Sequence, residues 1–310
     1  MRPWRPSRPQ GARAAVALTA LLATAGAAGG PAHASFPGRN GRIAFAGARE
    51  VASDIFTVGP DGSRLRRLTR TGLDSEPAWS PDGRTLAFAS GRDIDSNIWL
   101  MTARGGKQHR LLARSGWDDA PAWAAQGRRI GFTADYDGNL DLATVSTRGT
   151  HYRRRTRDRR DERAPAFSPN GKTVAFVRSS LRGDQICLLS LRTGKVRRLT
   201  RGGDDDEPSW SPNGRWLAFS GGELGRRDLY LVRSDGKGLH RLTRSGLDET
   251  DPAWSPNGTL IAFARGRPDE HELAVVRAAG GRARVLWAGK LDVQSPDWQP
   301  RPLRRKGSGR

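Results

Sequence analysis

Carboxylates gather just before six evenly spaced prolines, and they are the side chains of this sequence best placed to do chemistry. The prolines are Pro77, Pro121, Pro165, Pro208, Pro252 and Pro296, at steps of 44, 44, 43, 44 and 44 residues. The acids before them are Asp74 and Glu76; Asp118 and Asp119; Asp161 and Glu162; Asp205, Asp206 and Glu207; and Asp248, Glu249 and Asp251. Clustered carboxylates can bind a cation such as calcium, or a basic peptide. They can also cap the N–H groups of turns and offset nearby arginines, so both roles stay open.

Residue types that usually carry catalysis show no convergent pattern. His109, His151 and His240 fall in different repeats, so they are not expected to meet at one metal. His271 is expected to be a solvated loop histidine, and Cys187, the single cysteine, a small buried residue. Neither an HExxH nor a GxSxG motif occurs. We therefore predict no catalytic residue and no required cofactor. Calcium is the one cofactor that the clustered acids could bind.

Each repeat of about 44 residues contains four short segments. The first ends in Pro-x-Trp, with Phe167 in place of Trp in one repeat, and a Pro-Asp-Gly or Pro-Asn-Gly turn follows in most repeats, as in EPAWSPDGRTLAF at 76–88. In another repeat the turn is Ala-Ala-Gln-Gly at 124–127. Asp-Gly and Asn-Gly turns suit a tight hairpin to the second segment. The third segment begins with a polar residue, and the fourth is basic, as in LRRLT at 65–69. Short segments without helical periodicity, at this spacing, predict the four-stranded antiparallel blades of a β-propeller.

The two ends of the repeat array complete one another. Residues 40–70 contain the second to fourth segments without the first, and residues 295–300 contain only the first. Five complete units and one composite unit predict an all-β, six-bladed propeller in which N- and C-terminal strands together close one blade. Such closure leaves no open sheet edge between the first and last blades. The first strand of each blade lines the channel, so the acidic loops should converge at one channel mouth. Trp117, beside Asp118, would add an aromatic side chain to that rim.

The first 34 residues have the pattern of a secretory signal. Arginines at 2, 5, 8 and 13 precede an apolar run at 14–28 and an Ala-x-Ala site at 32–34. We predict a signal peptide at 1–34, the propeller at 35–300 and a basic, disordered tail at 301–310. No other stretch is long and apolar enough to span a membrane. We therefore expect an exported monomer, periplasmic or extracellular, without a transmembrane anchor.

The chain is strongly basic, with a net charge of +21 over 310 residues. Of its 53 basic residues 47 are arginine, a skew that a GC-rich coding sequence can also produce. Arginines of the fourth segments would protect the outer edge of each blade from pairing with another chain. Alternatively, this arginine-rich perimeter, including YRRRTRDRR at 152–160, could bind an anionic polymer of the cell envelope. Nucleic acid is not expected, because export separates the protein from most of it and aromatic residues are not interleaved.

The Pro-x-Trp-Ser-Pro-Asp-Gly hairpin, the strand led by Asp and the Arg-Leu-Thr strand resemble the WD40-like (PD40) repeat of the TolB type. The resemblance covers about 38 to 300 and implies a non-catalytic interaction protein of the cell envelope, with an envelope protein or basic peptide as partner. That family has an α/β domain ahead of the propeller, which the residues before Asn40 do not match. Similar repeats also form the propellers of serine peptidases and some polysaccharide lyases. A lyase or hydrolase acting at the mouth is therefore one alternative, and a scaffold for anionic polymers is another.

Overall fold

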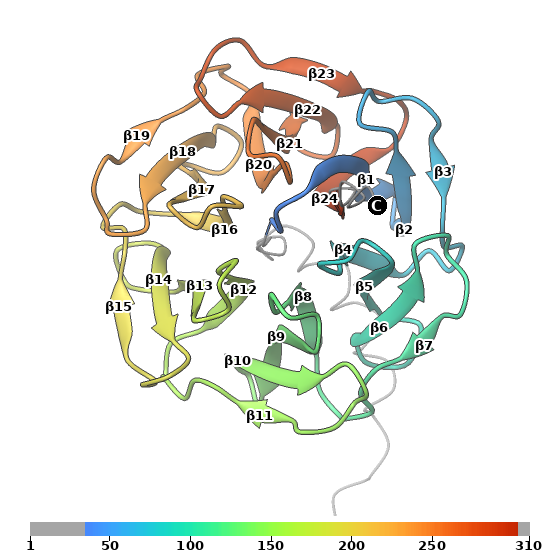
Figure 1. The fold of residues 1–310 in the computed structure, drawn as a ribbon, viewed down its shortest axis with the longest axis vertical. Coiled ribbons are helices and arrows are strands. Elements are labelled where there is room, and N and C mark those ends of the chain that lie inside the picture. Colours follow the sequence, from blue (N-terminus) through green and yellow to red (C-terminus); the bar gives the residue numbers. More distant parts are fainter. Residues whose placement is uncertain (1–34, 303–310) are drawn as a thin grey trace, which may run out of the picture.

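The computed structural model describes residues 35–302, which form six antiparallel sheets arranged as a ring around a central channel (Figure 1). Blade I joins β24 (Asp292–Arg301) to β1 (Arg39–Arg49), β2 (Ala52–Val58) and β3 (Arg66–Arg67). Blade II contains β4 (Asp74–Trp79), β5 (Thr85–Ser90), β6 (Asn97–Thr102) and β7 (His109–Arg110). Blade III contains β8 (Asp118–Trp123), β9 (Arg129–Tyr136), β10 (Asn139–Ser146) and β11 (Arg153–Arg154).

The other three blades repeat this order. Blade IV contains β12 (Glu162–Phe167), β13 (Thr173–Arg178), β14 (Gln185–Ser190) and β15 (Val196–Arg198). Blade V contains β16 (Asp206–Trp210), β17 (Trp216–Gly221), β18 (Asp228–Arg233) and β19 (His240–Arg241). Blade VI contains β20 (Asp248–Trp254), β21 (Leu260–Gly266), β22 (Glu272–Arg277) and β23 (Arg284–Trp287). The predicted all-β, six-bladed propeller is confirmed.

The composite blade closes the ring as the sequence predicts. β24 pairs with β1 in antiparallel register, with Ile43 opposite Trp298 and Gly47 opposite Val293. This pairing occupies the inner edge of β1, which would otherwise present unpaired backbone groups to the channel.

A buried aromatic layer explains why each repeat ends its second segment with phenylalanine. Phe45, Phe88, Phe132, Phe176, Phe219 and Phe263 are all 0–1% exposed. The aromatic residues of the first strands are also buried, and they pack between neighbouring blades. Aromatic side chains bury more apolar surface than other residues, so this repeated pair supplies much of the contact between blades.

Every first strand contains a β-bulge at the residue before the repeat proline. The six residues there have φ between 48° and 54°; they are Glu76, Ala120, Ala164, Glu207, Asp251 and Ser295. In the five blades outside the composite one, the register to the second strand shifts at this point, between Ser75 and Ala78 in blade II for example. Left-handed backbone is unfavourable for residues other than glycine. The bulge therefore needs local support, and it changes the direction of the side chains that precede the proline.

The ring has two faces that differ in their connections. On the mouth face, the loops between blades bond to the loops between second and third strands; Asp118 N–H donates to Ser96 O at 3.0 Å, for example. On the turn face, the two hairpin turns of each blade bond to one another, as Ala103 N–H does to Arg84 O at 2.8 Å. The first described residues run into the centre of the ring (Figure 1), where Phe36 is buried in a cluster with Ala78 and Trp123.

The predicted signal peptide at 1–34 and residues 303–310 of the predicted tail lie outside the described residues. Arg301, the first residue of that predicted tail, pairs with Arg39 in the composite blade. Over the described part of the chain, no helix has the length and hydrophobicity needed to cross a membrane.

Candidate functional site at the channel mouth

Charge is divided unequally between the two faces. The turn face comprises residues 38–42, 59–66, 80–84, 102–109, 124–129, 146–153, 168–172, 190–197, 211–215, 233–240, 255–259, 277–284 and 300–301. These residues include 22 Lys and Arg but only three acids, Asp61, Asp82 and Asp235. The other described residues include 23 Lys and Arg and 29 acids, and eight further Arg and Lys lie outside the described part. All acids of the predicted rim therefore lie off the turn face.

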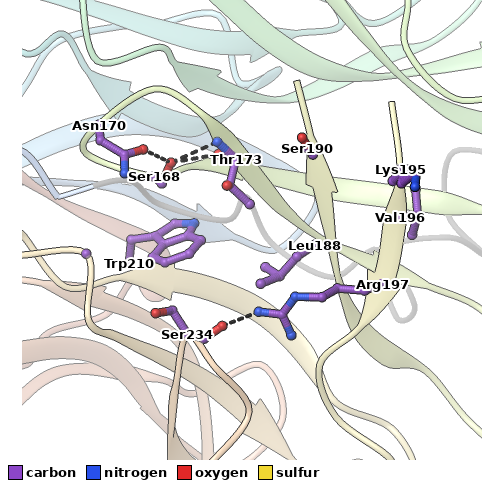
Figure 2. Close-up of a pocket in the computed structure, with 11 residues that line it drawn as sticks. Ser168, Asn170, Thr173, Leu188, Ser190, Lys195, Val196, Arg197, Trp210 and Ser234 are labelled. Carbon is purple, nitrogen blue, oxygen red and sulfur yellow. Dashed lines mark hydrogen bonds between the residues drawn. The ribbon is translucent and has the colours of Figure 1, made fainter. Parts of the chain in front are cut away.

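Three grooves open between blades on the turn face. They have volumes of about 520 Å³ between blades II and III, about 470 Å³ between IV and V, and about 750 Å³ between V and VI. Trp123, Trp210 and Trp254, one from each junction, line them. In the groove between blades IV and V, Arg197 donates across the opening to the carbonyl oxygen of Ser234 (Figure 2).

The predicted acids of the mouth point inward. Ten of the twelve carboxylates are buried, and only Asp119 and Asp161 are partly exposed. Trp117 is 43% exposed, so it is the aromatic residue that the rim presents to solvent. Two groups can be distinguished: carboxylates in the wall of the channel, and carboxylates in the junctions between neighbouring loops.

The channel group consists of Glu76, Asp119, Glu207 and Asp251. Glu76 Oε2 accepts the Ala120 N–H at 2.7 Å, and Glu207 Oε2 accepts the Asp251 N–H at 2.5 Å. Each bond therefore supports the left-handed residue of the next blade, which explains how two of the six bulges are held. Burial, followed by repulsion from Asp119, raises the pKa of Glu76 well above its usual value. Burial, followed by repulsion from Glu207, also raises the pKa of Asp251 well above its usual value. Burial and mutual repulsion thus favour the protonated forms of Glu76 and Asp251 in the channel group.

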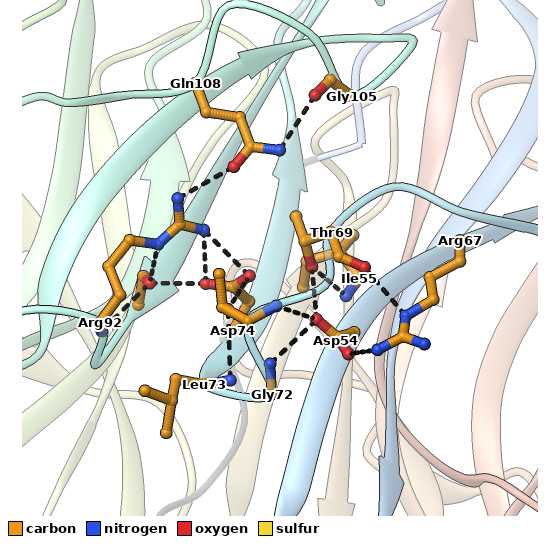
Figure 3. Close-up of polar contacts among 12 residues, drawn as sticks. Asp54, Ile55, Arg67, Thr69, Gly72, Leu73, Asp74, Arg92, Gly105 and Gln108 are labelled. Atoms are coloured by element: carbon orange, nitrogen blue, oxygen red, sulfur yellow. Dashed lines mark hydrogen bonds and ion pairs between the residues drawn. The ribbon is translucent and has the colours of Figure 1, made fainter.

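The junction group pairs with arginines near the ends of the second strands and loops. Asp74 accepts two hydrogen bonds from Arg92 Nη2, at 2.8 and 3.0 Å, and one from Ser90 Oγ at 2.5 Å (Figure 3). Asp118 accepts from Arg114 Nη1 at 2.6 Å, and Asp206 from Arg163 Nη1 at 2.8 Å.

Glu162 and Arg178 form the same kind of pair, whereas Asp205 and Glu249 have no ion pair among the described residues. Burial raises the pKa of Asp118 and of Asp205 to about 6, and burial also raises the pKa of Glu162 and Glu249. Side chains with so little exposed surface act mainly in holding neighbouring loops together.

A second set of residues positions these loops, and sequence reasoning gave it no role. Asp54, which begins the third segment of blade I, accepts Thr69 Oγ1 at 3.1 Å and the N–H groups of Thr71 and Gly72 at 2.9 and 3.2 Å (Figure 3). It also pairs with Arg67. Blade III repeats the arrangement, since Asp141 pairs with Arg154 and accepts a hydrogen bond from Thr156 Oγ1. Blade V repeats part of it: Asp228 pairs with Arg241, and Thr243 Oγ1 accepts the Leu229 N–H. The signal was present in the sequence, since Asp and the Arg-Leu-Thr triplet recur at a fixed separation.

His271 corrects the sequence-based expectation of a solvated loop histidine. Its side chain is only 12% exposed and lies between two carboxylates, with Nδ1 2.8 Å from Asp292 Oδ1 and Nε2 3.9 Å from Asp248 Oδ2. Burial alone would lower the pKa of His271, but contacts with Asp248 and Asp292 outweigh it and raise that pKa to about 10. The imidazole is therefore a cation at neutral pH, bridging blades VI and I.

The remaining predicted residues have defined places. Asp161 Oδ1 accepts the Leu140 N–H at 3.0 Å, and Asp248 Oδ1 accepts the Arg227 N–H at 2.9 Å. Both carboxylates thereby fix loops of the mouth face. No group of three or more His, Cys, Asp or Glu among residues 35–302 is arranged to hold a metal ion.

The architecture defines the class of the protein: a six-bladed β-propeller with four-stranded antiparallel blades. Comparison with known families then places it more closely. The chain belongs to the family described as the TolB beta propeller domain (PD40), whose model matches residues 70–256.

Curated relatives match over shorter stretches. A protein TolB homolog of Chlorobium luteolum is 35% identical over 69 residues, or 22% of this chain and 16% of that protein. The Tol-Pal system protein TolB of Syntrophus aciditrophicus is 41% identical over 69 residues, or 21% of this chain and 15% of that protein. The aligned part thus spans about one sixth of these relatives.

Solved structures share the fold over most of the chain. TolB from Acinetobacter baumannii superposes with a TM-score of 0.75 and 24% identity, covering 84% of this chain and 67% of that one. A putative TolB from Agrobacterium tumefaciens superposes with a TM-score of 0.69 and 20% identity, covering 82% of this chain and 91% of that one. An oligogalacturonate lyase from Vibrio parahaemolyticus superposes with a TM-score of 0.53 and 13% identity, covering 81% of this chain and 74% of that one. At these identities the likeness establishes the fold alone.

Proposed function

We propose that this chain is an exported, non-catalytic TolB-type propeller that binds a protein of the cell envelope at its mouth face. Membership of the TolB propeller family supports an interaction role, and one relative is named as a component of the Tol-Pal system. Export rests on the signal pattern of residues 1–34, and places the protein in the periplasm or outside the cell.

The observation that carries the proposal is the convergence of Glu76, Asp119, Glu207 and Asp251 in one channel wall. Burial and mutual repulsion favour the protonated forms of Glu76 and Asp251. A Lys- or Arg-containing segment of a partner would supply the positive charge that lets these carboxylates ionise. Exposed apolar side chains surround the mouth: Val51, Ile94, Leu181 and Leu224 lie in its loops at 69–108% exposure, together with Trp117. Such side chains, interspersed with charge, are typical of surfaces that dock proteins.

The geometry of His271 favours binding over catalysis. A lyase or hydrolase at the mouth would need a base that is deprotonated at working pH. The pKa of His271, raised to about 10 by Asp248 and Asp292 after the opposing effect of burial, leaves it protonated there. The enzyme alternative therefore has to recruit a buried carboxylate of the mouth, several of which, such as Asp74 and Glu76, already bond to an arginine or a backbone N–H.

The test is a cross-linking pull-down from envelope extract with the wild type and a channel variant carrying Glu76→Gln, Asp119→Asn and Asp251→Asn. These changes remove charge but keep hydrogen-bond acceptors, so folding should be retained. We expect the principal cross-linked band to weaken by about tenfold. The matched control carries Asp61→Asn, Asp82→Asn and Asp235→Asn on the turn face, where other repeats have Asn at the position of Asp82. Equal capture by the wild type, channel variant and control would refute the proposal.

No cofactor is part of this proposal, and calcium is the ligand to check. A calorimetric scan of the wild type in calcium and then in chelator measures it directly, since a ligand that binds only the folded state raises Tm. A rise in Tm that the channel variant abolishes would make the mouth a cation site and replace the basic peptide as its ligand.

A further inference from the structure

The basic residues of the turn face have almost no acidic partners. Among residues 35–302, the ion pair between Arg233 and Asp235 is the one formed on this face, whereas pairs such as Arg92–Asp74 and Arg163–Asp206 lie towards the mouth. Crowding is evident at Arg42, whose pKa is lowered first by burial and then by Arg66, Arg64 and Arg301. Positive charge is therefore concentrated on this face without compensation from within the chain.

Neither simple explanation of the basic composition accounts for this location. A coding bias explains why arginine outnumbers lysine, but it predicts an even distribution over the surface. Four of the five lysines in the described part, Lys107, Lys172, Lys195 and Lys237, also lie on the turn face. Edge protection explains charges on the outermost strands, but not those in the turns between first and second strands, such as Arg128 and Arg215.

One position of the turn face is basic in all six blades. It is a fourth-strand residue at a fixed register with the third strand; Arg66, for example, pairs with Thr57. From blade I to blade VI its occupants are Arg66, His109, Arg153, Arg197, His240 and Arg284. The strands that carry them, β3, β7, β11, β15, β19 and β23, form the outer ring in Figure 1. Arginine occupies this register in four blades and histidine in the other two, so these basic side chains form a ring around the perimeter rather than one patch.

The three grooves of the turn face lie along this ring. His109 lines the groove between blades II and III, Arg197 that between IV and V, and His240 that between V and VI. The groove in Figure 2 combines Lys195 and Arg197 with the partly exposed Ser190, whereas the Ser168 hydroxyl is buried and bonded to Asn170 and Thr173. Cations beside hydroxyl groups suit a ligand that carries both negative charge and many hydrogen-bonding groups.

We infer that the turn face docks an extended anionic polysaccharide whose repeating units carry carboxylate or phosphate groups. Arginine suits either group, because its guanidinium forms two parallel hydrogen bonds with them. A polymer can follow the ring and occupy several grooves in turn, so weak contacts add through multivalency. This surface lies opposite the mouth, and the inference does not depend on the proposed function.

Two other anionic partners fit the face less well. A membrane surface favours protruding apolar side chains beside the cations, but the most exposed ones, Ile94 and Leu181, belong to the mouth face. Nucleic acid in single strands favours exposed aromatic platforms. Among the described residues the exposed aromatic side chain is Trp117, which is also on the mouth face.

The experiment measures binding of the purified full chain to fluorescent polygalacturonate, for carboxylate, and to long-chain polyphosphate, for phosphate, over a salt titration. We expect wild-type affinity to fall at least about tenfold between roughly 50 and 200 mM salt, because bound cations release counterions. The turn-face variant Arg66→Gln, Arg153→Gln, Arg197→Gln and Arg284→Gln should bind at least about tenfold more weakly and with a shallower salt slope. Neutral dextran should not bind.

The matched control carries Arg49→Gln, Arg157→Gln, Arg182→Gln and Arg201→Gln, four exposed residues away from the turn face with the same total charge. Its affinity should change less than about twofold, since local contacts rather than net charge are responsible. Equal losses in both variants, or no loss in either, would overturn the inference. Tighter binding to phosphatidylglycerol vesicles or to DNA than to both polymers would also overturn it, in favour of a membrane or of nucleic acid.

A second turn-face variant guards against misfolding of the first, in which Arg66 and Arg197 each lose a hydrogen bond to a neighbouring turn. It carries Arg104→Gln, Arg148→Gln, Arg192→Gln and Arg282→Gln, all exposed turn residues. With Tm unchanged, it should reproduce the loss of polymer binding; wild-type affinity in this variant would contradict the inference.

Discussion

The mouth face and the turn face are built from the same repeat but use charge in opposite ways. Around the mouth, carboxylates are buried and engaged, as Asp74 is by Arg92 and Ser90. On the turn face, 21 of the 22 basic residues are exposed, and only three acids lie among them.

This difference separates charges that maintain the ring from charges that do not. A buried ion pair has lost its hydration, so removing one partner leaves the other in an unfavourable environment. An exposed cation keeps its hydration, and its neighbours only repel it weakly through water. Charges of the mouth face should therefore matter for stability, whereas those of the turn face are free to serve recognition.

The largest expected effect is the loss of a buried pair. Asp74→Ala should lower the free energy of unfolding by about 3–5 kcal/mol, because it leaves Arg92, 17% exposed, without its carboxylate. Its counterpart on the turn face is Asp235→Ala, which breaks the exposed pair with Arg233 and should leave the denaturation midpoint unchanged. Urea denaturation of both variants makes the comparison, and similar losses would mean that the two faces do not differ in this way.

A smaller effect is expected at the histidine between blades VI and I. His271→Gln should cost roughly 2–4 kcal/mol at pH 6, because it removes a buried cation between Asp248 and Asp292. The folded-state pKa of about 10 lies above the ordinary 6.5, so this stabilisation is complete below pH 6.5 and is lost as pH rises towards 10. The difference between wild type and variant should therefore shrink over that range. His240→Gln on the turn face is the control, and a difference that grows with pH would contradict the assignment.

The fold was predictable because its signals are local and repeated. A Pro-x-Trp, a turn with Asp-Gly or Asn-Gly and a buried phenylalanine recur every 44 residues or so, and the incomplete first and last units specify the composite blade. Each of these features acts within one hairpin. Sequence reasoning needs no information about neighbouring blades to recognise them.

The direction of the mouth acids was less predictable, because it depends on contacts between blades. The bulges at Ala120 and Asp251 are each supported by a carboxylate from the preceding blade, and the one at Ala164 by the Thr133 hydroxyl of that blade. His271 meets Asp248 and Asp292 from two different first strands, more than 20 residues away on either side. The unequal charge of the two faces could have been predicted from the sequence, because alternating strand directions assign the turns between first and second strands and between third and fourth strands to one face. The sequence analysis assigned the arginines to the outer strands instead.

The last comparison concerns a buried acid in a channel-lining strand and an exposed one on the turn face. Asp297 accepts the Trp79 N–H at 2.6 Å, and burial raises its pKa to about 8 despite that bond. A folded-state pKa above the unfolded value of 3.8 means that the folded chain holds the proton more tightly, so stability is fully present below pH 4 and declines as pH rises through 8.

Asp297→Asn keeps an acceptor for Trp79 without the charge, and should stabilise the protein at pH 8 by roughly 1 kcal/mol or more while having little effect at pH 4. Asp61→Asn, at an exposed turn, should leave the pH profile unchanged. Thermal unfolding of the three proteins from pH 4 to 8 decides the matter, and a variant that is less stable than the wild type at pH 8 would show that the ionised carboxylate supports the junction between blades I and II.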